Sequence, residues 1–188
     1  MKLKSEIREF ALTYRNSLEE EKYLDMSLAI TYKLCYMFPF KEAYDYHFFI
    51  GSSQKREIIT KPLIDVLLKS GRNVYVPKVD KNNILSTHKI HTIHDLKFGA
   101  FGIEEPVTVS TNAKDFDCII VPMLGADLKG NRVGYGKGFY DRFLENSTGV
   151  KIGVVFDACL VEELESEEHD VPLDLIITEN RVIETIRR

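Results

Sequence analysis

Residues 117–144 read DCIIVPMLGADLKGNRVGYGKGFYDRFL, and this stretch decides the fold that the sequence predicts. Residues 118–121 form a short apolar run, and Pro122 ends it by removing a backbone donor, so we expect a buried strand. The glycine-rich run VGYGKG follows a polar loop and leads into a helical pattern at Phe139. A strand, a glycine loop and a helix start together present backbone N–H groups to a phosphate.

Charged side chains flank this glycine loop. Arg132 and Lys137 supply cations for a phosphate, and Asp141 lies where a carboxylate could hold Mg²⁺ against it. The run is not a Walker A loop, because Gly138 rather than Ser or Thr follows Lys137. It is not a dinucleotide fingerprint either, since Phe139 stands where a small residue is needed. A plain glycine turn with solvated charges stays open as the simpler interpretation.

Composition narrows the class of protein. A chain of 188 residues suits one domain, so we expect residues 1–188 to fold together. The net charge of −4 argues against a nucleic-acid partner. There is no apolar signal core and no apolar run near the roughly 18 residues of a membrane span, so we expect a cytoplasmic protein without a membrane partner. We also expect a monomer. Three cysteines without a CxxC pair predict buried, reduced thiols: Cys35, Cys118 and Cys159.

Two helical patterns open the chain, at residues 2–18 and at about 19–38. In the first, Lys4 and Arg8 are four apart and share a face, for which a solvated basic surface is the simpler interpretation. The apolar stripe of the first helix is predicted at Leu3, Ile7, Phe10, Ala11 and Tyr14, and the buried side of the second at Leu24, Leu28, Tyr32 and Cys35.

The remaining patterns alternate between strands and helices. A strand at 46–50, a polar loop at 51–57 and a helix capped by Thr60 precede a strand at 73–77, which implies a parallel pair. Further segments are predicted as strands at 151–156 and 175–178, a short helix at 159–165 and an edge strand at 181–186. The alternation predicts an α/β three-layer sandwich with a mainly parallel central sheet and two N-terminal helices.

His88, His91 and His94 recur at every third residue, which invites comparison with a zinc site. Only the adjacent Asp95 could complete a ligand set, so we interpret these histidines as polar positions at a sheet edge. Residues 98–103 are an apolar loop punctuated by glycines. This loop either lines a pocket or packs two phenylalanines onto the core.

Several of these pieces occur together in one known family. The run VGYGKGFYDRFL, with HDVPLDLIITE downstream, resembles the 5-formyltetrahydrofolate cyclo-ligase family, also called methenyltetrahydrofolate synthetases. The resemblance extends over nearly the whole chain, and it is the combination that is specific. The other matching pieces are the spacing of Lys4 and Arg8, the spacing of Glu57 and Thr60, residues 75–77, and residues 101–106.

The resemblance implies a fold similar to that of certain sugar-phosphate isomerases and CoA transferases. It also implies ATP-dependent, Mg²⁺-assisted closure of 5-formyltetrahydrofolate to 5,10-methenyltetrahydrofolate, with release of ADP and phosphate. The implied ATP contacts are Lys4, Ser5, Glu6, Ile7, Arg8, Arg132, Val133, Gly134, Tyr135, Gly136, Lys137, Gly138, Phe139 and Tyr140. The implied folate contacts are Ser52, Glu57, Tyr135, Gly136, Lys137, Gly138 and Phe139. The implied magnesium ligands are Asp141 and Asp170, and the implied catalytic residues are Arg132, Lys137 and Tyr140.

The chemistry explains why the family needs such residues. A formamide oxygen is a poor leaving group, so ATP first converts it to an imidate phosphate that the second folate nitrogen can attack. Phosphoryl transfer requires mainly positioning and neutralisation of charge, which cations, backbone amides and Mg²⁺ supply. No covalent nucleophile of the protein is expected.

Two departures from the family and two alternatives remain. Lys55 and Arg56 make the loop before Glu57 more basic than is usual, either to attract a folate glutamate tail or because the substrate differs. Residues 123–127 differ mildly from the usual run of small residues.

The alternatives are an enzyme of the same broad fold that acts on a sugar phosphate, and a catalytically idle sensor of folate or nucleotide. Retention of the basic set with both aspartates argues against both.

We predict that Lys137→Ala loses ATP-dependent turnover while folding normally, because the substitution removes a cation from the phosphate loop. Turnover is measured against wild type, with circular dichroism as the control for folding. A well-folded variant with full activity would contradict the assignment of this loop.

Overall fold

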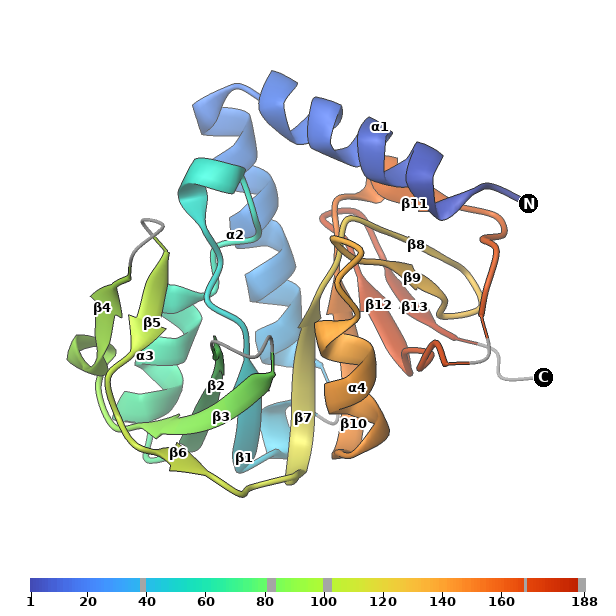
Figure 1. The fold of residues 1–188 in the computed structure, drawn as a ribbon. Helices are drawn as coiled ribbons and strands as arrows, with labels where there is room; N and C mark the ends of the chain where they lie inside the picture. Colours follow the sequence, from blue (N-terminus) through green and yellow to red (C-terminus); the bar gives the residue numbers. More distant parts are fainter. Residues whose placement is uncertain (38–39, 81–83, 100–102, 168, 186–188) are drawn as a thin grey trace.

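The computed structural model of the chain describes residues 1–37, 40–80, 84–99, 103–167 and 169–185. Within these ranges the chain forms four α-helices and thirteen strands (Figure 1). The helices are α1 (Lys4–Ser17), α2 (Glu20–Tyr36), α3 (Lys61–Lys69) and α4 (Phe139–Glu145). The strands are β1 (Asp45–Phe48), β2 (Asn73–Val79), β3 (Leu85–Ile90), β4 (Leu96–Phe98), β5 (Glu104–Pro106), β6 (Ser110–Thr111), β7 (Asp115–Pro122), β8 (Gly125–Asp127), β9 (Arg132–Val133), β10 (Thr148–Val154), β11 (Leu160–Val161), β12 (Leu175–Ile177) and β13 (Val182–Glu184).

The central sheet is mainly parallel, as predicted. In the described part of the chain it has eight strands, in the order β13-β12-β10-β7-β1-β2-β3-β6. The strands from β12 to β2 run parallel, whereas β13 pairs antiparallel with β12, β3 with β2, and β6 with β3. The predicted parallel pair is confirmed, because β1 and β2 are adjacent and α3 connects them. A second, three-stranded sheet has the order β11-β8-β9.

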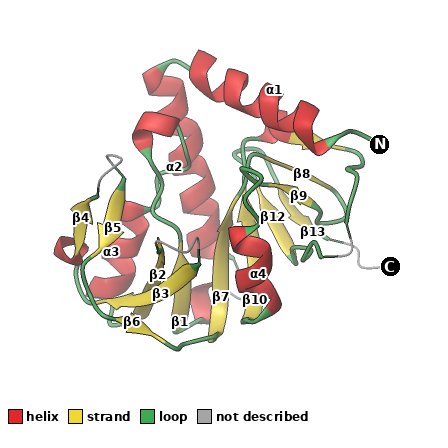
Figure 2. Ribbon diagram, viewed as in Figure 1, coloured by secondary structure: helices red, strands yellow, loops and turns green. Residues whose placement is uncertain are grey.

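Strand β7 divides the hydrophobic core into two layers. Its side chains alternate, so Cys118 and Ile120 pack with α2 and α3, whereas Ile119 and Val121 pack with α1, α4 and the small sheet. All four side chains are fully buried, and each apolar one contributes about 1.5–3 kcal/mol. The three-layer α/β architecture with two N-terminal helices is therefore confirmed (Figure 2). The likeness to sugar-phosphate isomerases and CoA transferases stays a prediction.

The predicted buried side of α2 is wrong. Leu28 and Tyr32 are 57% and 65% exposed, Leu24 is also exposed, and Cys35 is an exposed free thiol. The helix is apolar on two faces, and periodicity alone cannot tell which one meets the sheet. The side chains that face the core are Tyr23, Met26, Ile30 and Leu34. Of the predicted buried thiols, Cys118 and Cys159 are buried, and all three are free.

The predicted helix at 159–165 is also wrong. Leu160 and Val161 form β11, which pairs in parallel with Ala126 and Asp127 of β8. The next residues continue extended along the start of the chain, where the Lys2 N–H donates to the Glu163 carbonyl. Pairing with two distant segments overrode the weak helical pattern, because it gives backbone partners to Leu160, Val161, Glu163 and Glu165.

Among the described residues, the histidines at 88, 91 and 94 are not gathered into a cluster of potential metal ligands. The ring of His88 is buried and bonds to Ser86 and to the Thr108 carbonyl. The Asp95 carboxylate accepts the backbone N–H of His91 and so stabilises a turn.

The predicted edge strand at 181–186 is confirmed over Val182–Glu184. In the loop at 98–103, residues 100–102 lie outside the described residues, and Phe98 is exposed rather than packed on the core. No helix among the described residues is long and apolar enough to cross a membrane.

His47 in β1 is a fully buried titratable side chain. Neither ring nitrogen has a hydrogen-bond partner among the described residues. The ring centroids of Phe116 and Phe143 lie 5.2 Å and 4.3 Å away. Burial lowers the pKa of His47 to about 3, because the charged imidazolium would lose its hydration.

We predict that His47 makes the fold sensitive to acid. Below its ordinary pKa of 6.5 the unfolded chain binds a proton that the folded chain takes up only near pH 3. The contribution of His47 to the free energy of unfolding is thus fully present above pH 6.5. As the pH falls from 6.5 to 3, this free energy decreases by about 1.4 kcal/mol per pH unit. His47→Leu should flatten this slope of the free energy of unfolding, measured by urea titration across the window. Identical slopes for the variant and wild type would contradict the assignment.

Candidate functional site

Helix α1 covers the end of the sheet at which β7 ends (Figure 1). Its buried Ile7 packs so closely on Gly125 that a Cβ there would lie 2.4 Å from Ile7 Cγ2. Near the other end of α1, Arg15 Nη2 donates to the Met123 carbonyl at 2.6 Å. Carboxyl ends of parallel strands are where open α/β sheets bind ligands, so α1 forms one wall of the expected site.

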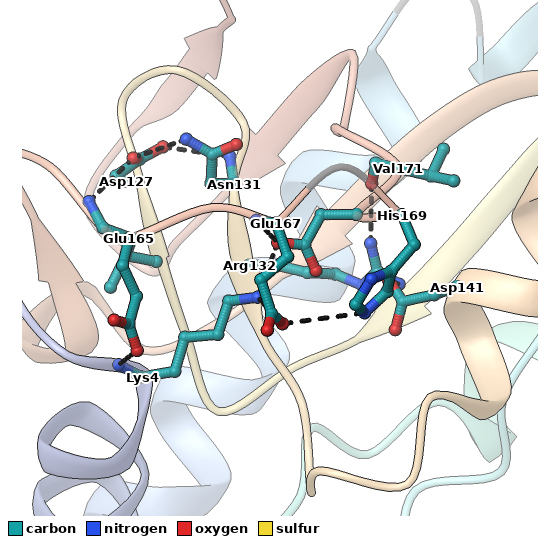
Figure 3. A network of polar contacts seen from close by, with 11 residues as sticks. Lys4, Asp127, Asn131, Arg132, Asp141, Glu165, Glu167, His169 and Val171 are labelled. Atoms are coloured by element: carbon teal, nitrogen blue, oxygen red, sulfur yellow. Dashed lines mark hydrogen bonds and ion pairs between the residues drawn. The ribbon is translucent and has the colours of Figure 1, made fainter.

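The Asp127 carboxylate organises the turn that leads into the glycine loop. Its Oδ1 accepts the backbone N–H groups of Lys129 and Asn131, and its Oδ2 accepts the Leu164 N–H. Its Oδ2 also accepts the Asn131 side-chain amide (Figure 3). The side chain is fully buried, and these four donors satisfy both of its oxygens. Asp127 thereby joins the β8–β9 turn to the β11 segment and sets the position of Arg132.

Arg132 connects the glycine-loop side of the site with the segment around Asp170. Its Nη2 lies 2.6 Å from Asp141 Oδ1 in α4, and its Nη1 donates to the Val171 carbonyl at 2.6 Å (Figure 3). The Arg132 side chain is only 5% exposed. Two residues predicted to bind different groups, Arg132 for phosphate and Asp141 for Mg²⁺, are therefore paired with each other.

Lys4 of α1 forms a second pair of a cation and a predicted magnesium ligand, in this case with Asp170. Its Nζ lies 2.5 Å from Asp170 Oδ2 and 3.4 Å from Glu167 Oε2. Its backbone N–H donates to the Glu165 carboxylate (Figure 3). Burial alone would raise the pKa of Asp170, but the bonds from Lys4 and from the Glu167 N–H outweigh it and hold that pKa below its usual range. Of the predicted ATP contacts nearby, Ser5 and Glu6 are exposed and Ile7 belongs to the core.

The glycine loop has the backbone conformation that its sequence predicts. Gly136 and Gly138 have φ values of +87° and +64°, a region that side-chain-bearing residues rarely adopt. Arg8 lies against this loop, where its Nε donates to the Gly134 carbonyl at 3.0 Å and its guanidinium faces Gly136. Lys137 is exposed and lies 5.8 Å from the Phe139 ring centroid.

Val133 and Tyr140 complete the predicted loop. Val133 is fully buried in β9 and anchors the loop to the core. The Tyr140 hydroxyl is buried and has no hydrogen-bond partner among the described residues. Burial, followed by the nearby charge of Glu57, raises the pKa of Tyr140, so this phenol stays protonated at neutral pH.

Glu57 is the centre of the predicted folate side. Its Oε1 accepts the Tyr135 hydroxyl at 2.6 Å, and its Oε2 accepts the Ser52 N–H at 2.9 Å. The Tyr23 hydroxyl also donates to the Glu57 carbonyl. Thr60 begins α3 as predicted, but its hydroxyl makes no cap; it bonds instead to the Phe49 carbonyl and the Gly51 N–H and so closes the base of this loop. The three residues Ser52, Glu57 and Tyr135 are thus brought together.

A narrow crevice, too small for a water molecule, is lined by Glu57 and Tyr135 together with residues of the core. The Lys55 ammonium lies 5.7 Å from the centroid of the Tyr135 ring. Arg56 instead pairs with Glu20. The crevice is lined by Arg15, Phe49, Glu57, Ile58, Pro122, Met123, Tyr135 and Val154.

The acidic groups on the phosphate side could hold a divalent ion. In the described part of the chain, ligand atoms of Glu167, His169 and Asp170 lie within 4.8 Å of one another. Carboxylate oxygens suit Mg²⁺, whereas imidazole suits it poorly. Asp141 is not in this group, but Arg132 links it to Val171, the residue after Asp170.

Sequence reasoning missed three contributors: Arg15, Asp127 and Glu167. Arg15 follows Lys4 and Arg8 along the same stripe of α1, at spacings of four and seven residues, and this periodicity was the available signal. The role of Asp127 had a weaker signal, an Asp at the start of a turn that contains Gly130. Glu167 becomes visible only once α1 is placed beside residues 163–170.

Comparison with known proteins agrees with this geometry. Residues 1–179 match the model of the 5-formyltetrahydrofolate cyclo-ligase family. The 5-formyltetrahydrofolate cyclo-ligase of Escherichia coli is 35% identical over 137 residues, which cover 68% of this chain and 75% of that protein. A probable 5-formyltetrahydrofolate cyclo-ligase of Schizosaccharomyces pombe is 31% identical over 154 residues, covering 70% and 74%.

Solved structures point to the same family. The NMR structure of Aquifex aeolicus 5,10-methenyltetrahydrofolate synthetase superposes with a TM-score of 0.86 and 34% identity, covering 98% of this chain and 94% of that one. The Mycoplasma pneumoniae 5,10-methenyltetrahydrofolate synthetase has a TM-score of 0.75 at 22% identity, which supports the fold alone. The family match over residues 1–179 and the close relatives lead to one conclusion. The chain belongs to the 5-formyltetrahydrofolate cyclo-ligase family, as its sequence predicts.

Proposed function

We propose that this enzyme closes 5-formyltetrahydrofolate to 5,10-methenyltetrahydrofolate, with ATP as co-substrate and Mg²⁺ as cofactor. The observation that carries the proposal is the pairing of cations and carboxylates at one edge of the sheet. Lys4 is paired with Asp170, and Arg132 with Asp141. Both cations belong to the expected phosphate contacts, and both carboxylates are the expected metal ligands.

We infer that these pairs exchange partners when Mg²⁺ and ATP bind. The ammonium of Lys4 and the guanidinium of Arg132 would turn to phosphate oxygens, and the carboxylates they release would turn to the metal. Each charged group then keeps an opposite charge beside it, which avoids the cost of an unpaired buried charge. Arg8 and Lys137 lie beside the same loop and add charge, and neither has a carboxylate partner to leave in the described part of the chain.

The donor set fits a magnesium ion. Asp141 and Asp170 offer carboxylate oxygens, and Glu167 lies close enough to Asp170 to add another. When bound, the ion would neutralise charge that develops on the phosphoryl group. Because Asp141 and Asp170 come from separate segments joined through Arg132, loading the site depends on all three residues.

The reaction follows from the folate side of the site. The formyl oxygen attacks the terminal phosphorus of ATP and ADP leaves, which gives an imidate phosphate. The second folate nitrogen attacks the activated carbon and gives up its proton, and phosphate departs with the oxygen and can carry that proton away. Glu57 and Ser52 would hold the folate, while the glycine loop from Tyr135 to Phe139 would border both reactants. Positioning supplies most of the acceleration, since no protein nucleophile is required.

Tyr140 is proposed as a donor to the reacting groups. A buried hydroxyl without a partner costs about 1–3 kcal/mol, and a ligand oxygen beside it would recover that cost.

We further propose that residues 1–188 act as one domain, in a cytoplasmic monomer with no nucleic-acid partner.

The proposal predicts that purified protein mixed with 5-formyltetrahydrofolate, ATP and Mg²⁺ generates the near-ultraviolet absorbance of methenyltetrahydrofolate. The signal should require all three components, because each supplies a part of the transfer. Folded protein that binds ATP yet gives no absorbance change with this folate would refute the proposed substrate.

Asp170→Asn should raise the Mg²⁺ concentration needed for half-maximal rate by about tenfold or more, because a neutral amide binds this ion poorly. Asp65→Asn is the matched control: Asp65 is paired with Lys69 on the exposed surface of α3, and its loss should leave the Mg²⁺ requirement unchanged. Equal Mg²⁺ requirements for Asp170→Asn and wild type would remove Asp170 from the metal site.

A further inference from the structure

Arg15 is a buried cation that the proposed reaction does not yet use. It is 3% exposed, near the end of α1, and its guanidinium has no carboxylate within ion-pair distance among the described residues. Its Nη2 donates to the Met123 carbonyl, and its Nη1 donates to the Tyr135 hydroxyl at 3.2 Å. The ring of Phe156 lies 5.9 Å from the guanidinium carbon, and Nε has no partner.

These contacts fix the direction of the hydrogen bonds around Tyr135. A guanidinium only donates, so the Tyr135 oxygen must accept from Arg15. The single phenolic proton is then committed to Glu57 Oε1, 2.6 Å away. Burial and the charge of Glu57 raise the pKa of Tyr135, so the proton stays on the phenol at neutral pH. The chain of bonds runs in one sense only, from Arg15 through Tyr135 to Glu57.

The same chain fixes the orientation of the Glu57 carboxylate. One of its oxygens faces Tyr135 and the other accepts the Ser52 N–H, so rotation of the group would break one of the two bonds. Without Arg15, the Tyr135 oxygen would lose a donor and its ring could turn away from the crevice. Glu57 would then lose the contact that aligns it.

Stability alone is a poor reason to bury this cation. A buried charge without an opposite charge is costly, and an apolar side chain would fill the same space more cheaply. We propose that Arg15 is a positioning residue, which acts through Tyr135 to orient Glu57 for the folate substrate. This inference rests on the proposed function, because it assigns Glu57 to the folate rather than to the nucleotide.

Arg15→Met removes both donors while keeping an unbranched side chain. We expect the KM for 5-formyltetrahydrofolate to rise about tenfold or more, the loss that removal of one hydrogen bond to a charged group produces. The KM for ATP should change less than about twofold. Arg15→Lys keeps the charge but cannot make both bonds, so its KM for the folate should lie between those of wild type and Arg15→Met.

A double-mutant cycle tests whether Arg15 acts through Tyr135. Tyr135→Phe removes the hydroxyl, and in that background Arg15→Met should raise the KM for the folate no further. A purely structural role would lower Tm and the active fraction in both backgrounds alike, without a selective change in KM. An unchanged KM for the folate in Arg15→Met, or effects of the two substitutions that multiply, would overturn the inference.

Wild-type turnover, measured first by the absorbance assay, keeps the two ideas separable. If wild type forms methenyltetrahydrofolate and Arg15→Met binds the folate normally by calorimetry, only the role of Arg15 falls. If folded wild type binds ATP but neither binds nor converts the folate, the proposed function fails, and the inference falls with it.

Discussion

The geometry of the site depends on one buried carboxylate, that of Asp127. Four donors converge on it from the β8–β9 turn and from Leu164, so the turn and the segment that leads to Asp170 cannot move independently. Arg132 is the first residue of β9 and follows this turn directly, so the turn fixes the position of Arg132. A fully satisfied buried network is rigid because breaking any one bond exposes the desolvation cost of the charge. The phosphate side is thus built on a fixed base.

Helix α1 connects this base with the folate side. Its stripe carries Lys4 beside Asp170, Arg8 over the glycine loop and Arg15 behind Tyr135. One helix therefore contacts residues assigned to the metal, to the phosphates and to the folate. Its own burial, through Ile7 and Ala11, fixes the rotation of all three cations at once. Under the proposed roles, the spacing of these residues along α1 would serve function as well as packing.

Much of the fold could be predicted from sequence, because strongly apolar runs such as that of β7 and punctuation such as Pro122 have local causes. The glycine loop was predictable for the same reason, since Gly136 and Gly138 take conformations that few other residues tolerate. The inner face of α2 and the strand β11 were not predictable. At both places the local sequence is compatible with two arrangements, and contacts with residues distant in the sequence determine which one forms. In the site, Lys4 and Asp170 were predicted from the family resemblance. Their direct pairing could be seen only in the folded chain, because they are far apart in the sequence.

The internal ion pairs also govern how ligands approach the protein. Each cation beside a carboxylate forms a dipole whose field fades quickly, and salt screens what remains beyond about 8–10 Å. With a net charge of −4, the molecule offers a polyanion such as ATP little attraction from afar. Encounter should then be slowed by the like net charges and should quicken as the ionic strength rises and screens them. Selection among nucleotides would begin only after contact, when Lys4 and Arg132 leave their carboxylates.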